Sequence, residues 1–309
     1  PAPFRRIKFK DAILKYGSDK PDLRNPLIIE DISDIMGKSD FAPFKDTVVR
    51  CIKVENIEKS NSWYKTMEEY VKGLHGNLGY IQVKKGMELK SSLTKFMSDE
   101  VKNELIEKMN LHENDALFIV ADKNRCARIM GNLRTKLGNE LDLIDKNRYE
   151  FCIINDFPFY EENEETGAIE FSHNPFSMPK GGLDALNGDN LEDVLAYQFD
   201  FVCNGIEMAS GAVRNHDLDI MRKAFELAGY SEDELKEKFK SLYTAFSYGA
   251  PPHAGMAPGI DRMLMLMRDL PNIRETSAFP LASNGQDAMM GCPSEVTEAQ
   301  LREVHIKVR

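Results

Sequence analysis

Long apolar segments are missing from this chain of 309 residues. No hydrophobic run approaches the roughly 20 residues that a membrane-spanning helix needs. The first residues, Pro-Ala-Pro-Phe-Arg-Arg, lack the apolar core of a secretory signal peptide. We therefore expect a cytoplasmic protein without a membrane partner. An initiator Met is also missing, so we expect the chain to begin inside a larger protein.

Paired cysteines and an excess of basic charge are missing as well. The five cysteines are widely spaced and form no Cys-x-x-Cys pair, which argues against a disulfide framework or a zinc site and fits a reducing cytosol. The 40 Lys and Arg against 50 Asp and Glu give a net charge of −10, with a pI near 5.3. A positive field over the whole molecule that would gather nucleic acid is excluded, so any contact with a polyanion must be local.

What remains is the composition of an ordinary globular protein, 42% hydrophobic and 29% charged, with a length typical of about two domains. Residues 1–26 predict one short helix followed by a turn-rich, charge-dense segment at 16–24. From about 27 to 147 the pattern alternates between helix and strand, which indicates a compact domain of its own. The remainder, 148–309, reads as α+β.

Several elements can be placed within these regions. Strands are predicted at Leu78–Val83, Ala116–Ala121 and Tyr149–Asn155. Helices are predicted at about 98–110 with Ser98 as N-cap, at about 123–137 ending at Gly138, near 218–228, and after the capping pattern Ser231-x-x-Glu234. The polar stretch Tyr160–Gly167 is predicted to be an exposed loop, and about 192–216 forms a long mixed segment.

A Gly- and Pro-rich loop runs into an apolar helix near the C-terminal end, at 249–267. Ile260, Met263, Leu264 and Met267 form one stripe and other apolar residues lie opposite, so we expect a central, buried helix. Arg262 lies in its first turn, where the helix dipole is positive and repels a cation. Arg262 either pairs with a nearby carboxylate or meets an anionic ligand.

The stretch 198–216 holds a second group of polar residues in apolar surroundings. Asp200 and Glu207 are seven apart, so on a strand they need a bend or bulge at Asn204-Gly205 to come together. Two carboxylates without a full cage suit Mg²⁺ held largely through phosphates. Arg214 follows the small residues 209–212, which leave room for a ligand that a guanidinium could read bidentately. The alternative is a surface strand with scattered charges.

A third stretch, Phe-Ser-His-Asn-Pro-Phe-Ser-Met-Pro at 171–179, contains His173. A single histidine is more often structural than functional. The neighbouring prolines and aromatic residues favour a fixed loop.

Together, these segments resemble bacterial-type aspartyl-tRNA synthetase, a class II aminoacyl-tRNA synthetase. Seven stretches match in the same order over essentially the whole chain: 16–24, 155–158, 173–176, 204–214, 248–252, the motif 3 stretch 259–262, and 272–280. The block at 27–147 is similar to the insertion (GAD) domain of bacterial-type members, which an amidotransferase subunit shares. Ala121-Asp122 and Met130–Arg134 carry that likeness.

The resemblance implies an α+β fold. Residues 1–26 would be the core segment after motif 2, residues 27–147 an inserted α/β GAD domain, and residues 148–309 the C-terminal part of the class II antiparallel-sheet catalytic core. It also implies a homodimer, with L-aspartate, ATP and the aspartate tRNA as partners; whether the asparagine tRNA is charged too is left open.

Roles for single residues follow from the resemblance. It implies that Arg262 contacts the terminal phosphates of ATP and that Gly259, Ile260 and Asp261 line the same pocket. Glu207 would bind ATP through Mg²⁺, with Asp200 helping to hold the metal. Arg214 would pair with the side-chain carboxylate of aspartate, and His173 would lie over the amino-acid pocket. The three catalytic residues implied are Arg262, Arg214 and Glu207.

The chain departs from the family pattern in two places. It has His173-Asn174-Pro175 where the family often has His-His-Pro, and the small run 209–212 where the family has Gly-Gly-Gly-Ser. The family's anticodon-binding domain, motif 1 and motif 2 arginine have no counterpart in these residues. The chain therefore resembles a C-terminal fragment, and we expect it to form no adenylate alone.

Other functions remain open. One is a related ligase that amidates aspartate, against which the GAD-like block argues. Another is a non-catalytic tRNA-binding module built around 27–147, or a degenerate class II paralogue.

Overall fold

The computed structural model describes residues 2–163 and 165–309. Pro1, at the start of the predicted segment 1–26, and Glu164, inside the predicted loop 160–167, lie outside the described residues. The chain divides into two compact units, one ending at Ala257 and one comprising Pro258–Arg309. Each is described by itself below. In the part of the chain described, no helix is both long enough and apolar enough to cross a membrane.

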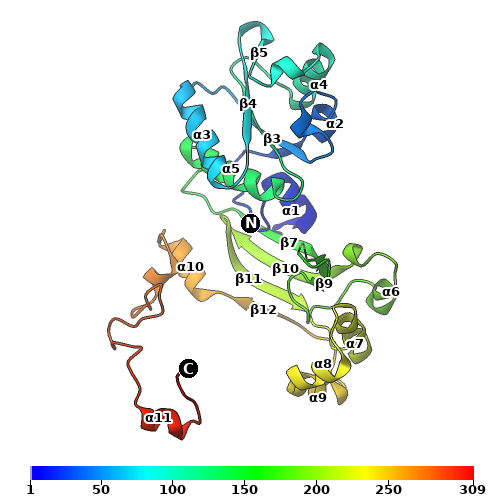
Figure 1. The fold of residues 1–309 in the computed structure, drawn as a ribbon, viewed down its shortest axis with the longest axis vertical. Helices are drawn as coiled ribbons and strands as arrows, with labels where there is room; N and C mark the ends of the chain where they lie inside the picture. Colours follow the sequence, from blue (N-terminus) through cyan, green and yellow to red (C-terminus); the bar gives the residue numbers. More distant parts are fainter. Residues whose placement is uncertain (1, 164) are drawn as a thin grey trace. The chain divides into compact units, whose positions relative to one another are not determined.

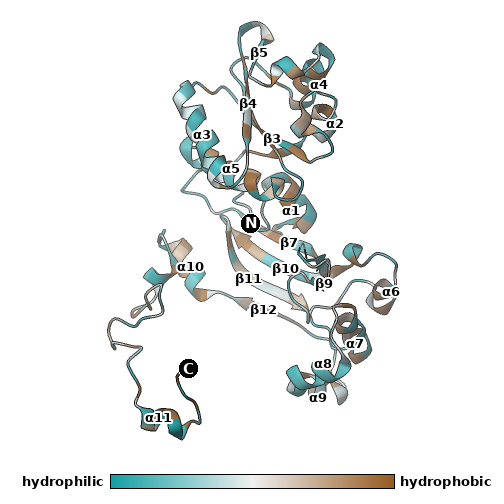
Figure 2. Ribbon diagram, viewed as in Figure 1, coloured by the Kyte–Doolittle hydropathy of each residue, from teal (hydrophilic) through white to brown (hydrophobic). Residues whose placement is uncertain are grey.

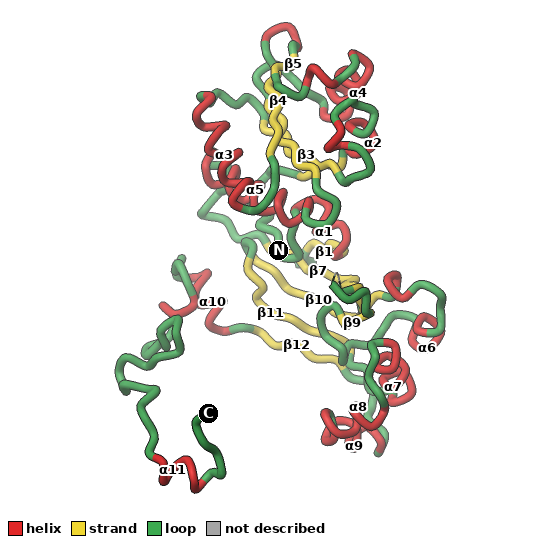
Figure 3. The backbone as a smooth tube through the Cα atoms, viewed as in Figure 1, coloured by secondary structure: helices red, strands yellow, loops and turns green. Residues whose placement is uncertain are grey.

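Two separate five-stranded sheets form the framework of the first unit (Figure 3). One has the order β2-β3-β6-β4-β5, and its strands are β2 (Ile29–Asp31), β3 (Val49–Val54), β6 (Ala116–Ala121), β4 (Leu78–Val83) and β5 (Leu89–Lys90). The other has the order β1-β7-β10-β11-β12, and its strands are β1 (Arg5–Lys8), β7 (Phe151–Pro158), β10 (Leu195–Cys203), β11 (Ile206–Val213) and β12 (Ala254–Pro258).

The sheet within 27–147 is covered by helices on both faces (Figure 1). Helices α2 (Ser33–Met36) and α4 (Asp99–Met109) pack on one face, around side chains such as Cys51, Ile81 and Ile119. Helices α3 (Asn61–Gly73) and α5 (Cys126–Glu140) pack on the other, around Ile52, Phe118 and Val120. Figure 2 shows α3 largely hydrophilic, as expected of a helix that buries only one stripe.

The α+β class is confirmed, because antiparallel pairing dominates both sheets. In the 27–147 block β3 pairs antiparallel with β2 and β6, and β4 with β5 and β6. The helices therefore cover both faces as in an α/β domain, but the strands do not run parallel. In the second sheet β7 pairs antiparallel with β10 and parallel with β1.

Smaller elements surround the second sheet. Helix α1 (Phe9–Tyr16) packs its buried Ala12 and Tyr16 near β7 and β10. A hairpin follows β7, and four short helices lie beyond it: β8 (Tyr160–Glu162), β9 (Ile169–Phe171), α6 (Gly182–Leu186), α7 (Leu218–Leu227), α8 (Glu232–Lys238) and α9 (Lys240–Ser247). The second unit contains α10 (Ile260–Met267), a 3₁₀ turn at Ile273–Thr276 and α11 (Glu298–Glu303).

Most predicted elements are confirmed, several to the residue. Strands β4 and β6 have the predicted bounds, Ser98 caps α4 by accepting from the Val101 amide, and the Ser231 capping box is present. Strand β7 begins two residues later than predicted and continues three residues further. The five cysteines are free, and only Cys292 is exposed.

Two predictions are wrong in part. Helix α5 starts at Cys126 and continues through Gly138 to Glu140, because Gly138 lies where the Asn25 amide packs against the helix and a side chain would not fit. The stretch Tyr160–Gly167 is not simply a loop: Tyr160–Glu162 pairs with Ile169–Phe171, and the Tyr160 ring is buried. The polar residues after Tyr160 favoured a loop, but the Tyr160 ring is buried and begins a short strand.

Candidate active site

The β10–β11 hairpin brings the two predicted carboxylates together. Its tight turn is Asn204-Gly205, both with positive φ, as a two-residue hairpin turn requires. The register pairs Phe201 with Ala209 but Val202 with Glu207, so Met208 is an extra residue in β11. The predicted bulge therefore exists, but it lies at Met208, and Asn204-Gly205 forms the turn.

This bulge decides which face Glu207 occupies. Asp200 pairs with Ser210, and the two therefore share a face of the sheet. Glu207 and Ser210 are three apart and would lie on opposite faces of a regular strand. The extra residue reverses the alternation, so Glu207, opposite Val202, comes to the same face as Asp200.

Asp200 is the more buried member of this pair, with 3% of its surface exposed. Burial raises the pKa of Asp200, and the neighbouring Glu207 carboxylate adds to the shift, whereas a hydrogen bond from Ser210 opposes it. The second carboxylate oxygen, Oδ1, is buried without a hydrogen-bond partner among the described residues. A buried acceptor in this state indicates that a cation or donor belongs beside it.

Lys20, to which no sequence pattern gave a role, lies against these carboxylates. Its Nζ forms an ion pair with Asp19 and lies 3.6 Å from Oε2 of Glu207. Burial lowers the pKa of Lys20, but its interactions with Asp19, Asp200 and Glu207 outweigh burial and raise it. The density of charge in the turn at 16–24 is the one sequence signal that could have drawn attention to this residue.

Arg214 continues the same face of the sheet beyond the end of β11, because Ser210, Ala212 and Arg214 alternate along one side. Its backbone amide donates to the His253 carbonyl at 2.9 Å. Its guanidinium lies beside Gly255, where a methyl group would be 3.5 Å from Nη2. The small residue gives the guanidinium its place over β12.

The His173 loop is hydrogen-bonded to the segment that carries Arg214. The backbones of Ser177 and Arg214 pair as an isolated antiparallel β-bridge. The Asn215 amide donates to the Phe176 carbonyl at 2.8 Å. His173 itself is exposed and meets the Phe157 ring edge-on at 4.9 Å between centroids. Asn174, one of the departures from the family pattern, accepts from the Phe176 amide and so fixes the turn.

Helix α10 begins at Ile260 with Gly259 as its N-cap, so Arg262 is in the first turn as predicted. The prediction that this helix is buried is wrong. Ile260 is 70% exposed and Met267 73%, because the unit Pro258–Arg309 has two short helices and a 3₁₀ turn but no layer of structure to cover them. Asp261 accepts a hydrogen bond from the Thr276 hydroxyl at 3.1 Å.

The first unit thus brings Asp200, Glu207 and Arg214 to one face of one sheet. The loop that carries His173 is joined by backbone hydrogen bonds to the residues on either side of Arg214. Gly259, Ile260, Asp261 and Arg262 follow one another at the start of α10, in the second unit.

Comparison with known proteins identifies the family. Residues 1–283 match the family described as tRNA synthetases class II (D, K and N). The chain belongs to the class II tRNA synthetases.

This class II synthetase chain has many close relatives among curated proteins. It is 48% identical over 316 residues to the aspartate–tRNA(Asp/Asn) ligase of Rickettsia akari (strain Hartford), covering 98% of this chain and 52% of that protein. It is 47% identical over 314 residues to the ligase of the same name from Wolbachia sp. subsp. Brugia malayi (strain TRS), covering 99% and 52%. The chain spans about half the length of the curated relatives it matches.

Solved structures also match the synthetase chain, among them the following two. An aspartyl-tRNA synthetase from Entamoeba histolytica matches 75% of this chain and 42% of its own, with 19% identity and a TM-score of 0.31. A putative aspartyl-tRNA synthetase from Leishmania major Friedlin matches 76% and 47%, with 18% identity and a TM-score of 0.33.

Asp200 and Glu207 are the residues of this class II chain that the sequence patterns linked to a metal. Among the described residues no group of three or more His, Cys, Asp or Glu side chains could hold a metal ion. Asp200 and Glu207 still fit a cation that brings most of its own ligands, since the unpartnered Asp200 Oδ1 lies in a site of negative charge.

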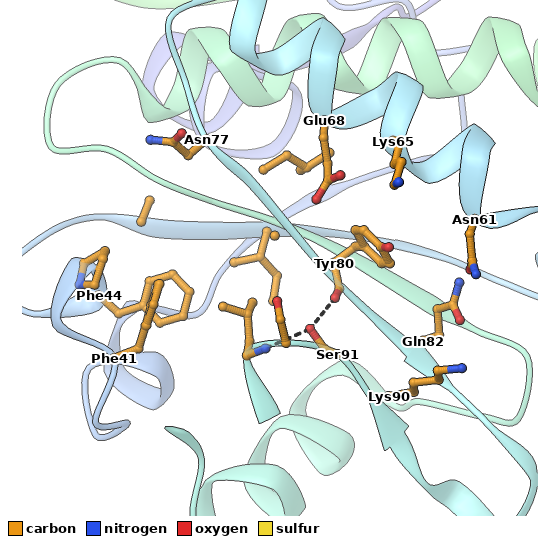
Figure 4. Close-up of a pocket in the computed structure, with 17 residues that line it drawn as sticks. Phe41, Phe44, Asn61, Lys65, Glu68, Asn77, Tyr80, Gln82, Lys90 and Ser91 are labelled. Carbon is orange, nitrogen blue, oxygen red and sulfur yellow. Dashed lines mark hydrogen bonds between the residues drawn. The ribbon is translucent and has the colours of Figure 1, made fainter. Parts of the chain in front are cut away.

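A separate cavity of about 790 Å³ opens on the 27–147 block of the synthetase chain (Figure 4). Tyr80 and Gln82 of β4 and Asn61 and Lys65 of α3 line one part of it, and Phe41 lies in another. The Ser91 hydroxyl donates to the Tyr80 carbonyl and so ties the residues that follow β5, which also line the cavity, to β4. This cavity lies on the other sheet from Asp200 and Glu207.

Proposed function

We propose that this chain supplies the aspartate- and ATP-binding half of an aspartate–tRNA ligase. The observation that carries the proposal is the placement of Asp200, Glu207 and Arg214 on one sheet face by a bulged hairpin. Membership of the class II synthetases and relatives named aspartate–tRNA(Asp/Asn) ligases support it. The domain arrangement proposed is a core segment at 1–26, a GAD-type insertion at 27–147 and the motif 3 part of the core at 148–309.

In this proposal the sheet face divides into an aspartate end and an ATP end. Arg214 pairs with the side-chain carboxylate of L-aspartate, and His173 lies over the amino acid. Glu207 and Asp200 serve the ATP end. Arg262 binds the terminal phosphates, with Gly259, Ile260 and Asp261 lining that pocket; an anion there gains from both the guanidinium and the helix N-terminus.

The reaction needs no nucleophile from the protein. An oxygen of the substrate α-carboxylate attacks the α-phosphorus of ATP, and pyrophosphate leaves. A hydroxyl of the terminal ribose of tRNA then attacks the acyl carbon, and AMP leaves. The side chains proposed here act by positioning the reactants and neutralising their charge, which can supply much of the rate enhancement.

Mg²⁺ would be held by Glu207 and Asp200 together with the phosphates of ATP. It would supply charge neutralisation on the phosphates. In the chain itself, the Lys20 ammonium already lies 3.6 Å from the Glu207 carboxylate, so this end of the face attracts cations.

The remaining partners are proposed from the family and from the names of the relatives. These are the aspartate tRNA, the asparagine tRNA as a second substrate, and a second copy of the protein in a homodimer. We propose the cytoplasm as the location.

The proposal is tested by aspartate-dependent ATP–pyrophosphate exchange in the full-length gene product. Arg214→Ala should raise the aspartate KM by about 100-fold, because a charge-assisted bidentate pair is lost, with little change in the ATP KM. Arg222→Ala, an exposed arginine paired with Asp219 and Glu232, is the matched control and should leave both values within twofold.

An unchanged aspartate KM in Arg214→Ala would remove Arg214 from this role. Absence of aspartate-dependent exchange in the full-length wild type would refute the proposed function itself. The 309-residue chain assayed alone should stay at background, because it has no counterpart of the motif 2 arginine.

A further inference from the structure

Arg134, on helix α5 of the 27–147 block, is a buried cation that the proposed reaction does not use. Its surface is 2% exposed. Its guanidinium donates to three backbone carbonyls of one preceding segment: Nε to Leu27 at 2.6 Å, and Nη2 to Asn25 at 2.7 Å and to Asp22 at 3.0 Å. One side chain therefore fixes the path of the backbone from Asp22 to Leu27.

No carboxylate forms an ion pair with Arg134 among the described residues. The guanidinium carbon instead lies 5.0 Å from the centre of the Tyr16 ring, at the end of α1. Burial lowers the pKa of Arg134 to about 10, so the side chain keeps its charge at neutral pH. The planar guanidinium can donate several hydrogen bonds to these carbonyls and also lie over the Tyr16 ring, which a lysine ammonium group could not do in the same geometry.

The segment is held in return from the same helix. Asn25 Nδ2 donates to the Arg134 carbonyl at 2.9 Å, and Asn25 Oδ1 accepts from the Leu27 amide at 3.1 Å. Close by, Gly17 at the end of α1 touches Gly131 of α5: a methyl group on Gly131 would lie 2.4 Å from the Gly17 oxygen. Helix α5 thus contacts both ends of the segment Gly17–Leu27.

The other side of this segment meets the proposed ATP end of the sheet face. A methyl group on Gly205, in the β10–β11 turn, would lie 3.4 Å from the Asp22 Cβ and 3.7 Å from the Lys20 oxygen. Lys20 extends from the same segment to Glu207. A shift of the backbone at 20–22 would therefore move the ammonium group away from the carboxylate.

We infer that Arg134 is a positioning residue that acts from the 27–147 block: it fixes the backbone of Asp22–Leu27 and thereby sets Lys20 against Glu207. The block is then a support for the carboxylate pair as well as a separate domain. The kinetic part of this inference rests on the proposed function, whereas the structural part does not.

The structural part is tested by amide hydrogen exchange on the 309-residue chain. Arg134→Lys keeps the charge but loses the planar guanidinium, so the amides of Lys20, Arg24, Asn25 and Leu27 should exchange at least about tenfold faster. The amides of β6 should be unchanged. Arg128→Gln, an exposed arginine on the same helix, is the control and should change neither group.

Asn25→Ala loosens the same segment from its other side and should give the same pattern. It keeps the test decisive if Arg134→Lys folds poorly. Equal acceleration in β6 and in residues 20–27 would mean that Arg134 only stabilises the fold, and unchanged exchange at 20–27 in both variants would overturn the inference.

The kinetic part uses ATP–pyrophosphate exchange in the full-length gene product. Arg134→Lys should raise the KM for MgATP by about tenfold and leave the aspartate KM within twofold, because Lys20 touches Glu207 and not Arg214. An equal rise in both KM values, or in neither, would overturn this role. If the wild type shows no aspartate-dependent exchange, the proposed function fails, and the amide exchange still decides whether Arg134 holds the segment.

Discussion

Gly211 lies on β11 where its neighbours leave no room for a side chain. A methyl group there would lie 2.6 Å from the Phe199 ring and 2.7 Å from the Gly255 carbonyl oxygen. Gly211 projects to the face opposite Ser210 and Ala212, because side chains alternate along a strand. At this position the small residue serves the packing of three strands, whereas Ala212, on the other face with Arg214, is fully buried.

We expect Gly211→Ala to lower the free energy of unfolding by about 1–3 kcal/mol, since the Gly255 backbone cannot move aside. Urea denaturation measures this change. Gly73→Ala, at the end of α3 with nothing within 4 Å of the added carbon, is the control and should be neutral or slightly stabilising. Equal midpoints for the two variants would show that the sheet has room at Gly211.

At the scale of elements, Asp122 holds the turn that leads into α5. Its Oδ1 accepts from the amides of Arg125 at 2.7 Å and Asn124 at 3.1 Å, and its Oδ2 accepts from the Arg125 guanidinium at 2.8 Å. Burial acts to raise the pKa of Asp122, but these hydrogen bonds outweigh it and hold the pKa below its usual value. The ionised carboxylate therefore stabilises the turn that precedes the helix carrying Arg134.

Asp122→Ala should lower the free energy of unfolding by about 1 kcal/mol at pH 7, because the hydrogen bonds of the turn are lost. The folded-state pKa lies below the unfolded one, so this contribution is present above the ordinary Asp pKa and is lost as the pH falls through the lowered value. Urea curves at pH 7 and near pH 2 should show the difference shrinking. Asp122→Asn keeps an acceptor, so its effect should be smaller than that of alanine. It removes the same titrating group, so its effect should shrink by the same amount as the pH falls. An alanine effect equal at both pH values contradicts the assignment.

Sequence patterns predicted elements well where the signal is local. Strands β4 and β6 are short runs of apolar and β-branched residues between turns, and Ser98 and Ser231 are recognisable caps. The end of α5 was predicted too early because Gly138 was interpreted as a helix terminator. In the structure this glycine makes room for the side chain of Asn25, 113 positions earlier in the chain. No local pattern carries that contact.

The candidate site could be predicted as a set of residues but not as an arrangement. The odd spacing of Asp200 and Glu207 required an irregularity, yet only the strand register places it at Met208. Lys20 and Arg134 were not assigned, because their partners are Glu207 and three carbonyls far away in the sequence. The roles given to His173, Arg214, Glu207 and Arg262 stay predictions until variants are measured.

At the scale of the whole molecule, the burial of apolar residues is very uneven. Both cores of the 27–147 block consist entirely of residues from that block, such as Ile32 and Leu105 in one and Leu27 and Leu137 in the other. The unit Pro258–Arg309 has no buried residue, although α10 is one of the most apolar helices in the sequence. The periodicity of a sequence shows which face of a helix is apolar, but it does not show which other residues pack against that face.

We therefore expect residues 27–147, expressed alone, to unfold in one cooperative urea transition with a slope of about 1–2 kcal/mol per molar. Residues 258–309 alone should show no cooperative transition, because isolated short helices without a packed face are unstable in water. Circular dichroism measures both. The 27–147 piece loses the contacts of Arg134 with Asp22 and Asn25, so Arg134→Lys should destabilise it less than it destabilises the 309-residue chain. A gradual, non-cooperative melt of 27–147 would contradict its status as a domain, and equal destabilisation of both proteins would place the main role of Arg134 inside the block.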